Sequence, residues 1–200
     1  MVENTAFLKG HDWEISAPTT WDTSSFAGLK AVLHEDRRDG SANWLLPGIQ
    51  ALAVHRLGVW IQADEFPRLL RRPAHFLHRL LYGYVRSFLG FEIPDSVRLG
   101  RRVMFFHQHG VVIDAQCVIG DDCVFHHGVT LAFNKRFGSP TSLYYAPQVG
   151  SRVSFGVGCI VLGGVRIGDG ATIGPNAVVT TDVPPGASVA APPSRILRLR

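Results

Sequence analysis

The chain has 200 residues, 46% of them hydrophobic, so it can bury a sizeable core and fold as one or two domains. Its formal net charge of +4 comes with no basic block interleaved with aromatic residues, which argues against a nucleic-acid partner. The three cysteines lack CxxC spacing, which argues against a disulfide framework and favours reduced thiols in the cytoplasm.

The beginning of the chain shows no targeting signal. Residues 1–5 lack the basic and apolar regions of a signal peptide. The longest apolar stretch, residues 45–61, is broken by a proline and three polar residues, so it is too short and too polar to span a bilayer. We therefore expect a cytoplasmic protein without membrane contact.

The first 90 residues show helical patterns. Serine caps, apolar residues at helical spacing and proline punctuation predict three helices. We expect them from the Ser24-Ser25 cap to about Asp39, over residues 46–61, and over about 68–89. The sequence thus predicts a helical N-terminal domain, residues 1–90, that serves in packing or oligomerisation.

After Gly90 the apolar pattern takes a period of six residues. Large apolar residues stand at Ile93, Leu99, Phe105, Ile113, Ile119, Phe125 and Leu131, and again at Val149, Phe155, Val161, Ile167, Ile173 and Val179. A small or β-branched residue stands two positions before almost every one of them, and glycine often follows. The two exceptions to the spacing are the steps from Phe105 to Ile113 and from Leu131 to Val149.

A six-residue period is typical of a triangular β-helix. Each coil has three short parallel strands, and each strand needs one large inward residue and one small residue beside a corner, where glycine is expected to supply positive φ angles. Thirteen hexads give about four to five coils. We therefore predict an α+β chain: the helical domain, a left-handed parallel β-helix of hexapeptide repeats over residues 91–186 with a loop at 133–147, and a tail over 187–200.

The three cysteines, Cys117, Cys123 and Cys159, all fall in the small inward position of a hexad. We expect them to be core residues, and neither metal ligands nor nucleophiles.

The first break in the period places a histidine at a corner. Two extra residues between Phe105 and Ile113 push His107 out of register, and Glu92 lies fifteen residues earlier, slightly less than one coil. We expect the two side chains on vertically adjacent corners, where the carboxylate would orient the imidazole as a general base that deprotonates an acceptor hydroxyl. The alternative is a surface histidine and a solvated glutamate.

The second break, residues 133–147, carries polar and aromatic side chains. We expect an exposed loop that closes over an acceptor, with Lys135 or Arg136 meeting a carboxylate or phosphate. An irregular coil that only fills the gap is the alternative. His127 and His109 are candidate neighbours of the acceptor, while the adjacent His126-His127 pair should face different directions and is not expected to bind one metal ion.

On these motifs the chain resembles the serine acetyltransferase family of the hexapeptide-repeat acyltransferases. The motifs are Ala53-Val54-His55-Arg56-Leu57, Gly90-Phe91-Glu92-Ile93-Pro94, His107 to Gly110, Gly128-Val129-Thr130-Leu131, Val161-Leu162-Gly163-Gly164-Val165, Asp182-Val183-Pro184-Pro185 and Pro192-Pro193-Ser194-Arg195-Ile196. The resemblance covers about residues 25–197. It implies a homotrimer or a dimer of trimers, with acetyl-CoA between neighbouring subunits and His107 as the catalytic histidine.

The acceptor pocket departs from the family pattern. Phe106 stands where the family has aspartate before the histidine, Glu92 replaces the usual aspartate of the dyad, and Tyr145-Ala146-Pro147 aligns with an Arg-His-Pro motif involved in serine recognition. Phe106 and Ala146 cannot make the polar contacts that an ammonium and a carboxylate require. We therefore expect acetyl transfer to a small hydroxylated acceptor: a serine-like amino alcohol, another metabolite or a sugar. A genuine serine O-acetyltransferase of cysteine biosynthesis with an altered pocket is the alternative.

The resemblance also implies where the coenzyme lies. Its residues would be Gly156, Val157, Gly163, Gly164, Gly174 and Pro175, with Arg195 near the phosphates, and no metal is expected. Two more distant alternatives are a zinc hydratase on the same fold, which needs three converging histidines, and a non-catalytic partner protein.

Overall fold

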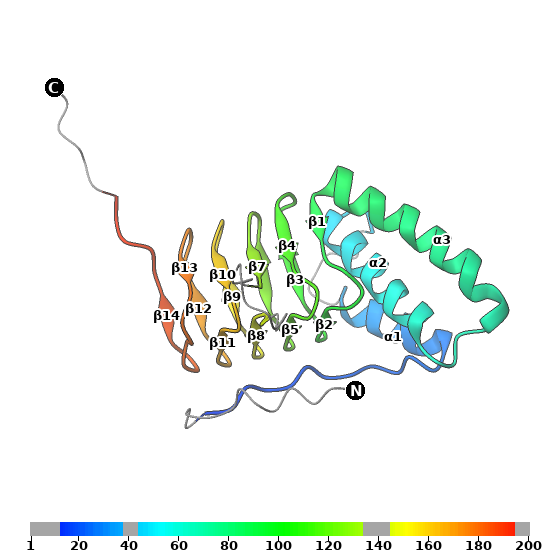
Figure 1. Ribbon diagram of the computed structural model, residues 1–200, viewed down its shortest axis with the longest axis horizontal. Helices are drawn as coiled ribbons and strands as arrows, with labels where there is room; N and C mark the ends of the chain where they lie inside the picture. The colour runs from blue at the N-terminus through cyan, green and yellow to red at the C-terminus, as the bar shows by residue number, and fades with distance from the viewer. Residues whose placement is uncertain (1–12, 38–43, 134–144, 195–200) are drawn as a thin grey trace, which may run out of the picture.

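The computed structural model describes residues 13–37, 44–133 and 145–194, and within them three helices precede a stack of short parallel strands (Figure 1). Helix α1 spans Phe26–Glu35, α2 spans Pro47–Gln62 and α3 spans Arg68–Tyr84, which continues as a π-helix over Val85–Leu89. The predicted cap is confirmed, because the Ser25 hydroxyl accepts the Gly28 N–H at 3.0 Å. Helix α1 ends earlier than predicted, with Asp36 as its C-cap.

Helix α2 packs polar side chains against the first coil. His55 and Arg56 are only 2% and 1% exposed. The His55 Nε2 lies 3.2 Å from the Val97 carbonyl, and the Arg56 guanidinium donates to the carbonyls of Leu99 and Gly100. A continuous backbone edge that has no strand above it needs such donors, and the helix supplies them. These two residues therefore join the helices to the coils.

Helix α3 covers α2 with a narrow face. His78 is its only buried residue, while apolar side chains such as Leu69 and Phe76 are 89% and 66% exposed. The apolar residues that suggested an oligomerisation unit therefore lie on the outer side of this helix.

The strands form three parallel sheets, one for each side of a triangular coil. Sheet A consists of β1 (Phe91–Glu92), β4 (Val111–Ile113), β7 (Thr130–Ala132), β10 (Ile160–Leu162) and β13 (Val178–Val179). Sheet B consists of β2 (Arg98–Leu99), β5 (Val118–Ile119), β8 (Gln148–Val149) and β11 (Arg166–Ile167). Sheet C consists of β3 (Met104–Phe106), β6 (Val124–His126), β9 (Ser154–Phe155), β12 (Thr172–Ile173) and β14 (Ser188–Val189). The predicted fold class, helices followed by a left-handed parallel β-helix, is confirmed.

The inward positions agree with the hexad pattern. Of the large residues, all but Phe105 are buried, and Phe105 is half-buried against the same core. Cys117, Cys123 and Cys159 are buried in the small positions as free thiols, and burial raises the pKa of each to about 12, so they are core residues.

The prediction that the glycine after each large residue supplies a positive φ angle is wrong. Gly100, Gly120 and Gly150 are not among the residues with positive φ; non-glycine residues such as Arg102 and Asp122 hold those angles instead. A Cβ on Gly100 would lie 2.5 Å from the carbonyl carbon of Gly120, directly below it. Glycine stands there because neighbouring coils approach too closely for any side chain.

Each of the three edges of the triangle carries a different feature, after which we name it. The histidine edge joins sheet C to sheet A and contains residues 107–110, 127–129, 156–159 and 174–177. The insertion edge joins sheet A to sheet B and contains the described residues 133, 145–147 and 163–165. The strap edge joins sheet B to sheet C and contains residues 100–103, 120–123, 150–153 and 168–171.

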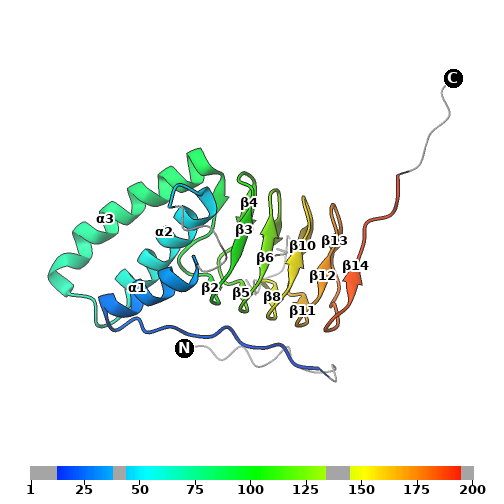
Figure 2. The same cartoon turned by 180° about the vertical axis from the view of Figure 1, so that it is seen from behind.

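Residues 13–23, the strap, run along the coils in an extended conformation (Figures 1 and 2). The Ser16 N–H donates to Asp169 at 3.1 Å and the Thr19 N–H donates to Asp121 at 2.9 Å. Arg166 donates to the Trp13 carbonyl and stacks over the Trp13 ring at 4.8 Å. The strap thereby joins the last full coils to the first.

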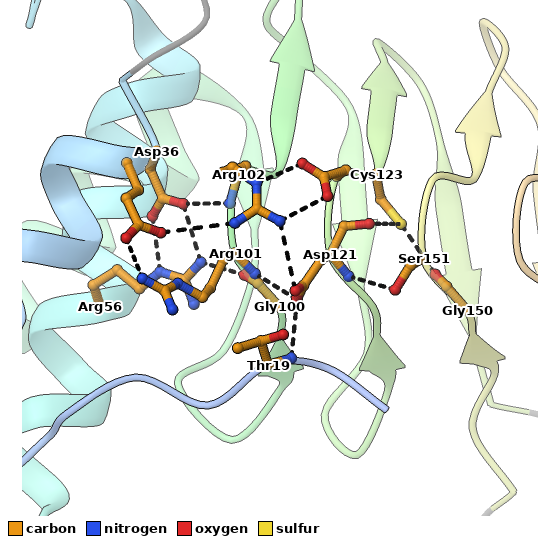
Figure 3. Close-up of polar contacts among 12 residues, drawn as sticks. Thr19, Asp36, Arg56, Gly100, Arg101, Arg102, Asp121, Cys123, Gly150 and Ser151 are labelled. Atoms are coloured by element: carbon orange, nitrogen blue, oxygen red, sulfur yellow. Dashed lines mark hydrogen bonds and ion pairs between the residues drawn. The ribbon is translucent and has the colours of Figure 1, made fainter. Parts of the chain in front are cut away.

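A network of charged residues continues from the strap edge to the helices (Figure 3). The Asp36 carboxylate accepts from Arg56 Nε at 2.9 Å and from the Arg102 N–H at 3.0 Å. Arg102 in turn binds Asp122 with two nitrogens, at 2.6 and 2.7 Å. The end of α1 is therefore fixed to both α2 and the first coil.

Over the described ranges, no helix combines the length and the apolar character that crossing a bilayer requires.

Candidate functional site

His107 lies at an enlarged corner of the histidine edge. Phe106 pairs with His126 and Val112 pairs with Thr130. Five residues separate these paired positions in the first coil, and three separate them in the next. His107 and His109 have φ angles of 64° and 83°, in the left-handed region that non-glycine residues seldom occupy. Arg102 and Asp122 on the strap edge have similar angles, so the feature that distinguishes His107 is the enlarged corner.

Aromatic rings from the second coil stack beneath this corner. The His107 and His127 ring centroids are 5.8 Å apart, edge to face, and those of Phe106 and His126 are 5.7 Å apart. The His126 Nδ1 lies 2.9 Å from the Phe155 carbonyl, which can only accept, so this nitrogen carries the proton. The neutral ring then keeps Nε2 as an acceptor. His127, a predicted neighbour of the acceptor, is thus placed beside His107.

Glu92 forms no hydrogen bond or ion pair with His107 in the part of the chain that the structure describes. It lies on β1, opposite Val112, and its carboxylate is 3.6 Å from the Arg86 guanidinium. The reason is the length of the first coil, which has twenty residues because Phe91 pairs with Val111. Glu92, only fifteen residues before His107, therefore lies on strand β1 beyond the corner that holds His107. That Glu92 orients His107 stays a prediction.

His109 turns toward the start of the first coil. Its Nδ1 lies 2.9 Å from the position that a Cβ on Gly90 would occupy, and the Gly110 N–H donates to the Gly90 carbonyl at 2.9 Å. Gly90 itself has a φ of 73°, so the close approach and the backbone angle both require glycine.

A cavity of about 410 Å³ opens beside His107. It lies between strand β3 and the adjoining ends of α1 and α2. Its lining residues are Asp36, Arg37, Leu46, Pro47, Gly48, Ile49, Leu52, Val103, Met104, Phe105, Phe106, His107 and Gln108. The volume is within the range of small-molecule sites, and most of the wall is apolar with a few polar groups, as is usual for such sites.

A close contact between α2 and β3 forms one wall of the cavity. A Cβ on Gly48 would lie 2.9 Å from the Phe105 Cβ and carbonyl oxygen, so the first turn of the helix rests directly on the strand. Sequence reasoning did not find this wall. The hexad period describes contacts within the coils, and no pattern in the chain marks which helix end faces which strand.

The residues predicted to hold the coenzyme fall on two edges. Gly156, Val157, Gly174 and Pro175 follow His127 along the histidine edge, where the Gly158 N–H donates to the His127 carbonyl and the Asn176 N–H donates to that of Val157. Gly163 and Gly164 lie on the insertion edge, and Gly164 packs against Tyr145. The two groups are therefore not brought together within one chain.

The remaining predicted site residues lie away from His107 or outside the described ranges. Tyr145 and Ala146 are half-buried on the insertion edge, and Ala146 packs against the core. Lys135, Arg136 and Arg195 lie outside the described residues. Among the residues that the structure describes, no group of three or more histidine, cysteine or acidic residues could hold a metal ion.

Comparison with known proteins identifies the repeat. Residues 146–181 match the model of the family described as bacterial transferase hexapeptide (six repeats). This range contains the regular hexads that follow the insertion.

Two bacterial relatives match over most of the chain. The serine acetyltransferase of Mycobacterium tuberculosis is 37% identical over 151 residues, which are 76% of this chain and 61% of the relative. That of Helicobacter pylori is 36% identical over 163 residues, which are 80% of this chain and 88% of the relative. The chain thus spans less than two thirds of the first relative and nearly all of the second.

Solved structures of similar shape bear the same name. The soybean serine acetyltransferase apoenzyme superposes with a TM-score of 0.64 at 30% identity, covering 88% of this chain and 70% of that one. The native serine acetyltransferase 1 of Entamoeba histolytica has a TM-score of 0.67 at 23% identity, covering 83% and 64%, and shows the fold alone. From its hexapeptide coils, its helical cap and these similarities together, the chain belongs to the serine acetyltransferase family of hexapeptide-repeat transferases.

Proposed function

We propose that this chain is an O-acetyltransferase that moves the acetyl group of acetyl-CoA to a hydroxyl of a small acceptor. The observation that carries the proposal is the position of His107, which lies at the enlarged corner and lines a cavity of about 410 Å³. The family membership supports the reaction class.

The proposed reaction is a direct transfer. His107 removes the proton of the acceptor hydroxyl, and the oxygen attacks the thioester carbonyl carbon. The carbon–sulfur bond then breaks, and the CoA thiolate leaves and takes the proton back from the imidazolium. Backbone N–H groups at the enlarged corner are suited to stabilising the oxyanion between these two events.

The relatives support L-serine as the acceptor, because the proteins of M. tuberculosis, H. pylori and soybean are all named serine acetyltransferases. This supports the alternative of a genuine serine acetyltransferase over the broader expectation from the sequence. A second candidate, a hydroxylated acceptor without an ammonium group, is favoured by Phe106, which is 46% exposed beside His107 where an acidic residue would be needed.

The coenzyme is proposed to lie along the histidine edge. Gly156, Val157, Gly174 and Pro175 would hold its pantetheine arm, because they continue the same edge from His127 toward the later coils. We further propose a homotrimer, with acetyl-CoA between neighbouring subunits. An assembly of this kind would also give Tyr145 and Ala146 a route to the site of a neighbouring chain.

The proposal is tested with His107→Ala. Loss of the general base should lower acetyl-CoA turnover about 10²–10⁴-fold. The rate is measured as thiol release with L-serine and with hydroxylated acceptors that lack the ammonium, and mass spectrometry identifies the O-acetyl product. His75→Ala, in α3 and outside the lining of the cavity, is the matched control and should retain the wild-type rate. Near-normal turnover by His107→Ala would refute the mechanism.

A further inference from the structure

Helix α3 and the π-helix that continues it present apolar side chains to the outside of the molecule. The helix lies on the outer side of the helical region, with α2 between it and the coils (Figures 1 and 2). The exposed apolar and aromatic side chains, which we call the α3 strip, are 46% to 89% exposed: Leu69, Leu70, Phe76, Leu77, Leu80, Tyr84 and Phe88. They recur every three or four positions, so they share one face of the helix. A continuous apolar strip of this kind marks an interaction surface.

The charge beside the strip has one sign. Residues 66–91 contain five arginines and no aspartate or glutamate. Arg68, Arg72 and Arg79 are exposed, and they form no ion pair within the described part of the chain, whereas Arg86 lies 3.6 Å from a carboxylate. With about 3.6 residues per turn, these arginines lie on one flank of the strip. The partner that covers the strip must therefore tolerate or offset a row of positive charge.

The first turns of α3 concentrate this charge where the helix itself opposes it. Arg68, Arg71 and Arg72 lie within the first five residues of the helix, and its first turn contains no acidic residue. The N-terminus of a helix carries a partial positive charge, so cations are unfavourable there and an external anion is favourable. Leu69 and Leu70, between these arginines, are 89% and 55% exposed. Anionic groups and apolar surface are thus required of the partner at the same place.

A second copy of this helix does not meet both requirements. In a symmetric contact between two antiparallel helices, the same flank of each helix faces its counterpart. The arginine rows would then face each other, with no acidic residue in 66–91 of either chain to offset them. A lipid surface with anionic headgroups differs in this respect, because it offers phosphates directly beside acyl chains.

We propose that α3 binds the surface of an anionic lipid membrane, with the α3 strip among the acyl chains and Arg68, Arg72 and Arg79 at the phosphates. Helices with an apolar face, a basic flank and aromatic residues lie in the plane of a membrane in this way. Such a helix needs no spanning length, so the lack of a spanning helix in the described ranges does not bear on it. The sequence expectation of no membrane contact considered only segments that cross a bilayer, and we revise it here.

The test measures how the full chain partitions onto lipid vesicles by cosedimentation. Vesicles of phosphatidylcholine alone are compared with vesicles that contain about one third phosphatidylglycerol. The wild type should bind the anionic vesicles at least about tenfold more tightly at about 0.1 M salt. The difference should shrink at about 0.5 M salt, because salt screens the attraction between exposed charges.

Two double variants separate apolar insertion from charge. Phe76→Ser with Leu80→Ser should weaken binding about tenfold or more, because both side chains leave water on insertion. Arg68→Gln with Arg72→Gln should weaken binding to anionic vesicles about tenfold or more, and should leave the weak binding to phosphatidylcholine unchanged. All four side chains are exposed, so the variants should keep the fold, which circular dichroism checks.

The matched control removes the same charge elsewhere. Arg98 and Arg152 are exposed arginines of the coils, and Arg98→Gln with Arg152→Gln should bind like the wild type. An equal loss in this control would show that net charge alone attracts the vesicles and would overturn the proposal. No binding of the wild type to either vesicle would overturn it too, as would full binding by Phe76→Ser with Leu80→Ser.

Sedimentation velocity without vesicles addresses the second copy directly. If Phe76→Ser with Leu80→Ser reduces the number of subunits in the assembly, another chain covers the strip and the membrane proposal fails. An unchanged assembly together with lost vesicle binding supports it. Turnover that depends on His107 is measured separately and does not enter either outcome.

Discussion

His55 is a histidine that the fold keeps neutral. It is 2% exposed in α2, its Nε2 faces the Val97 carbonyl, and its Nδ1 has no hydrogen-bond partner among the described residues. Burial, and after it the neighbouring charge of Arg56, lowers the pKa of His55 to about 3. The protonated ring is thus excluded from the folded state while remaining accessible in the unfolded chain.

We predict that His55 makes the fold sensitive to moderate acid. His55 binds a proton near pH 6.5 in the unfolded chain and only near pH 3 in the folded chain. The free energy of unfolding therefore decreases as the pH is lowered from about 6.5 to about 3, by up to about 1.4 kcal/mol per pH unit from this group. His55→Gln keeps a donor for Val97 and removes the titration. Urea unfolding at pH 7 and pH 5 should show a smaller loss for the variant. An equal loss would mean that other groups cause the acid sensitivity.

At the residue scale the sequence indicated single side chains better than their partners. The lengthened step after Phe105 was sufficient to single out His107, because a break in a regular period is a local property. The pairing with Glu92 depended on the length of the coil, which the same two extra residues changed.

The glycine column of the strap edge controls how closely the coils stack. Gly100 lies above Gly120 and Gly120 above Gly150, and a Cβ on Gly100 or Gly120 would lie 2.5 Å from the backbone of the next coil. Gly83 in α3 is different, because a Cβ there would meet nothing within 4 Å.

These two environments predict opposite effects of the same substitution. Gly120→Ala forces the backbone of adjacent coils apart and should destabilise the protein by about 2–3 kcal/mol. Gly83→Ala should stabilise it by about 0.5–1 kcal/mol, because alanine loses less conformational entropy in a helix. Chemical denaturation of both variants gives the comparison. A stabilising Gly120→Ala would show that the coils can separate without cost.

At the element scale the coils were predictable and the helix contacts were not. Each strand of a coil repeats one inward pattern, so every hexad is independent evidence for the same fold. The packing of α2 on β3 brings together residues that are far apart in the chain, and it involves polar side chains such as Arg56 that a search for apolar faces overlooks.

The strap connects opposite ends of the molecule through two aspartates. Burial opposes the ionisation of Asp169, but hydrogen bonds from Ser16 and Ser151 outweigh it and hold its pKa below the ordinary value. The pKa of Asp121 is lowered as well, because donors including Thr19 outweigh burial. Groups with lowered pKa values stabilise the fold above their unfolded pKa of about 3.9 and lose that contribution as the pH falls below it.

We predict that Asp169→Asn loosens the strap at neutral pH. The neutral amide is a weaker acceptor for the Ser16 N–H, so amide hydrogens of residues 14–17 should exchange about tenfold faster or more. Hydrogen-exchange mass spectrometry reports this, with the coils as an internal reference. Asp64→Asn, at the exposed turn between α2 and α3, serves as the control. Unchanged exchange in the strap would mean that the Trp13–Arg166 and Thr19–Asp121 contacts are sufficient to hold it on the coils.

The course of the strap also constrains the order in which the molecule assembles. Ser16 and its partner Asp169 are separated by 153 positions, and Trp13 and Arg166 by the same number. On the ribosome, the first of these residues emerges long before the second has been synthesised, so the strap must wait while the coils form one after another beside it. Its docking is a late, long-range closure. The strap is thus made before the coils that it binds and reaches its native position after them.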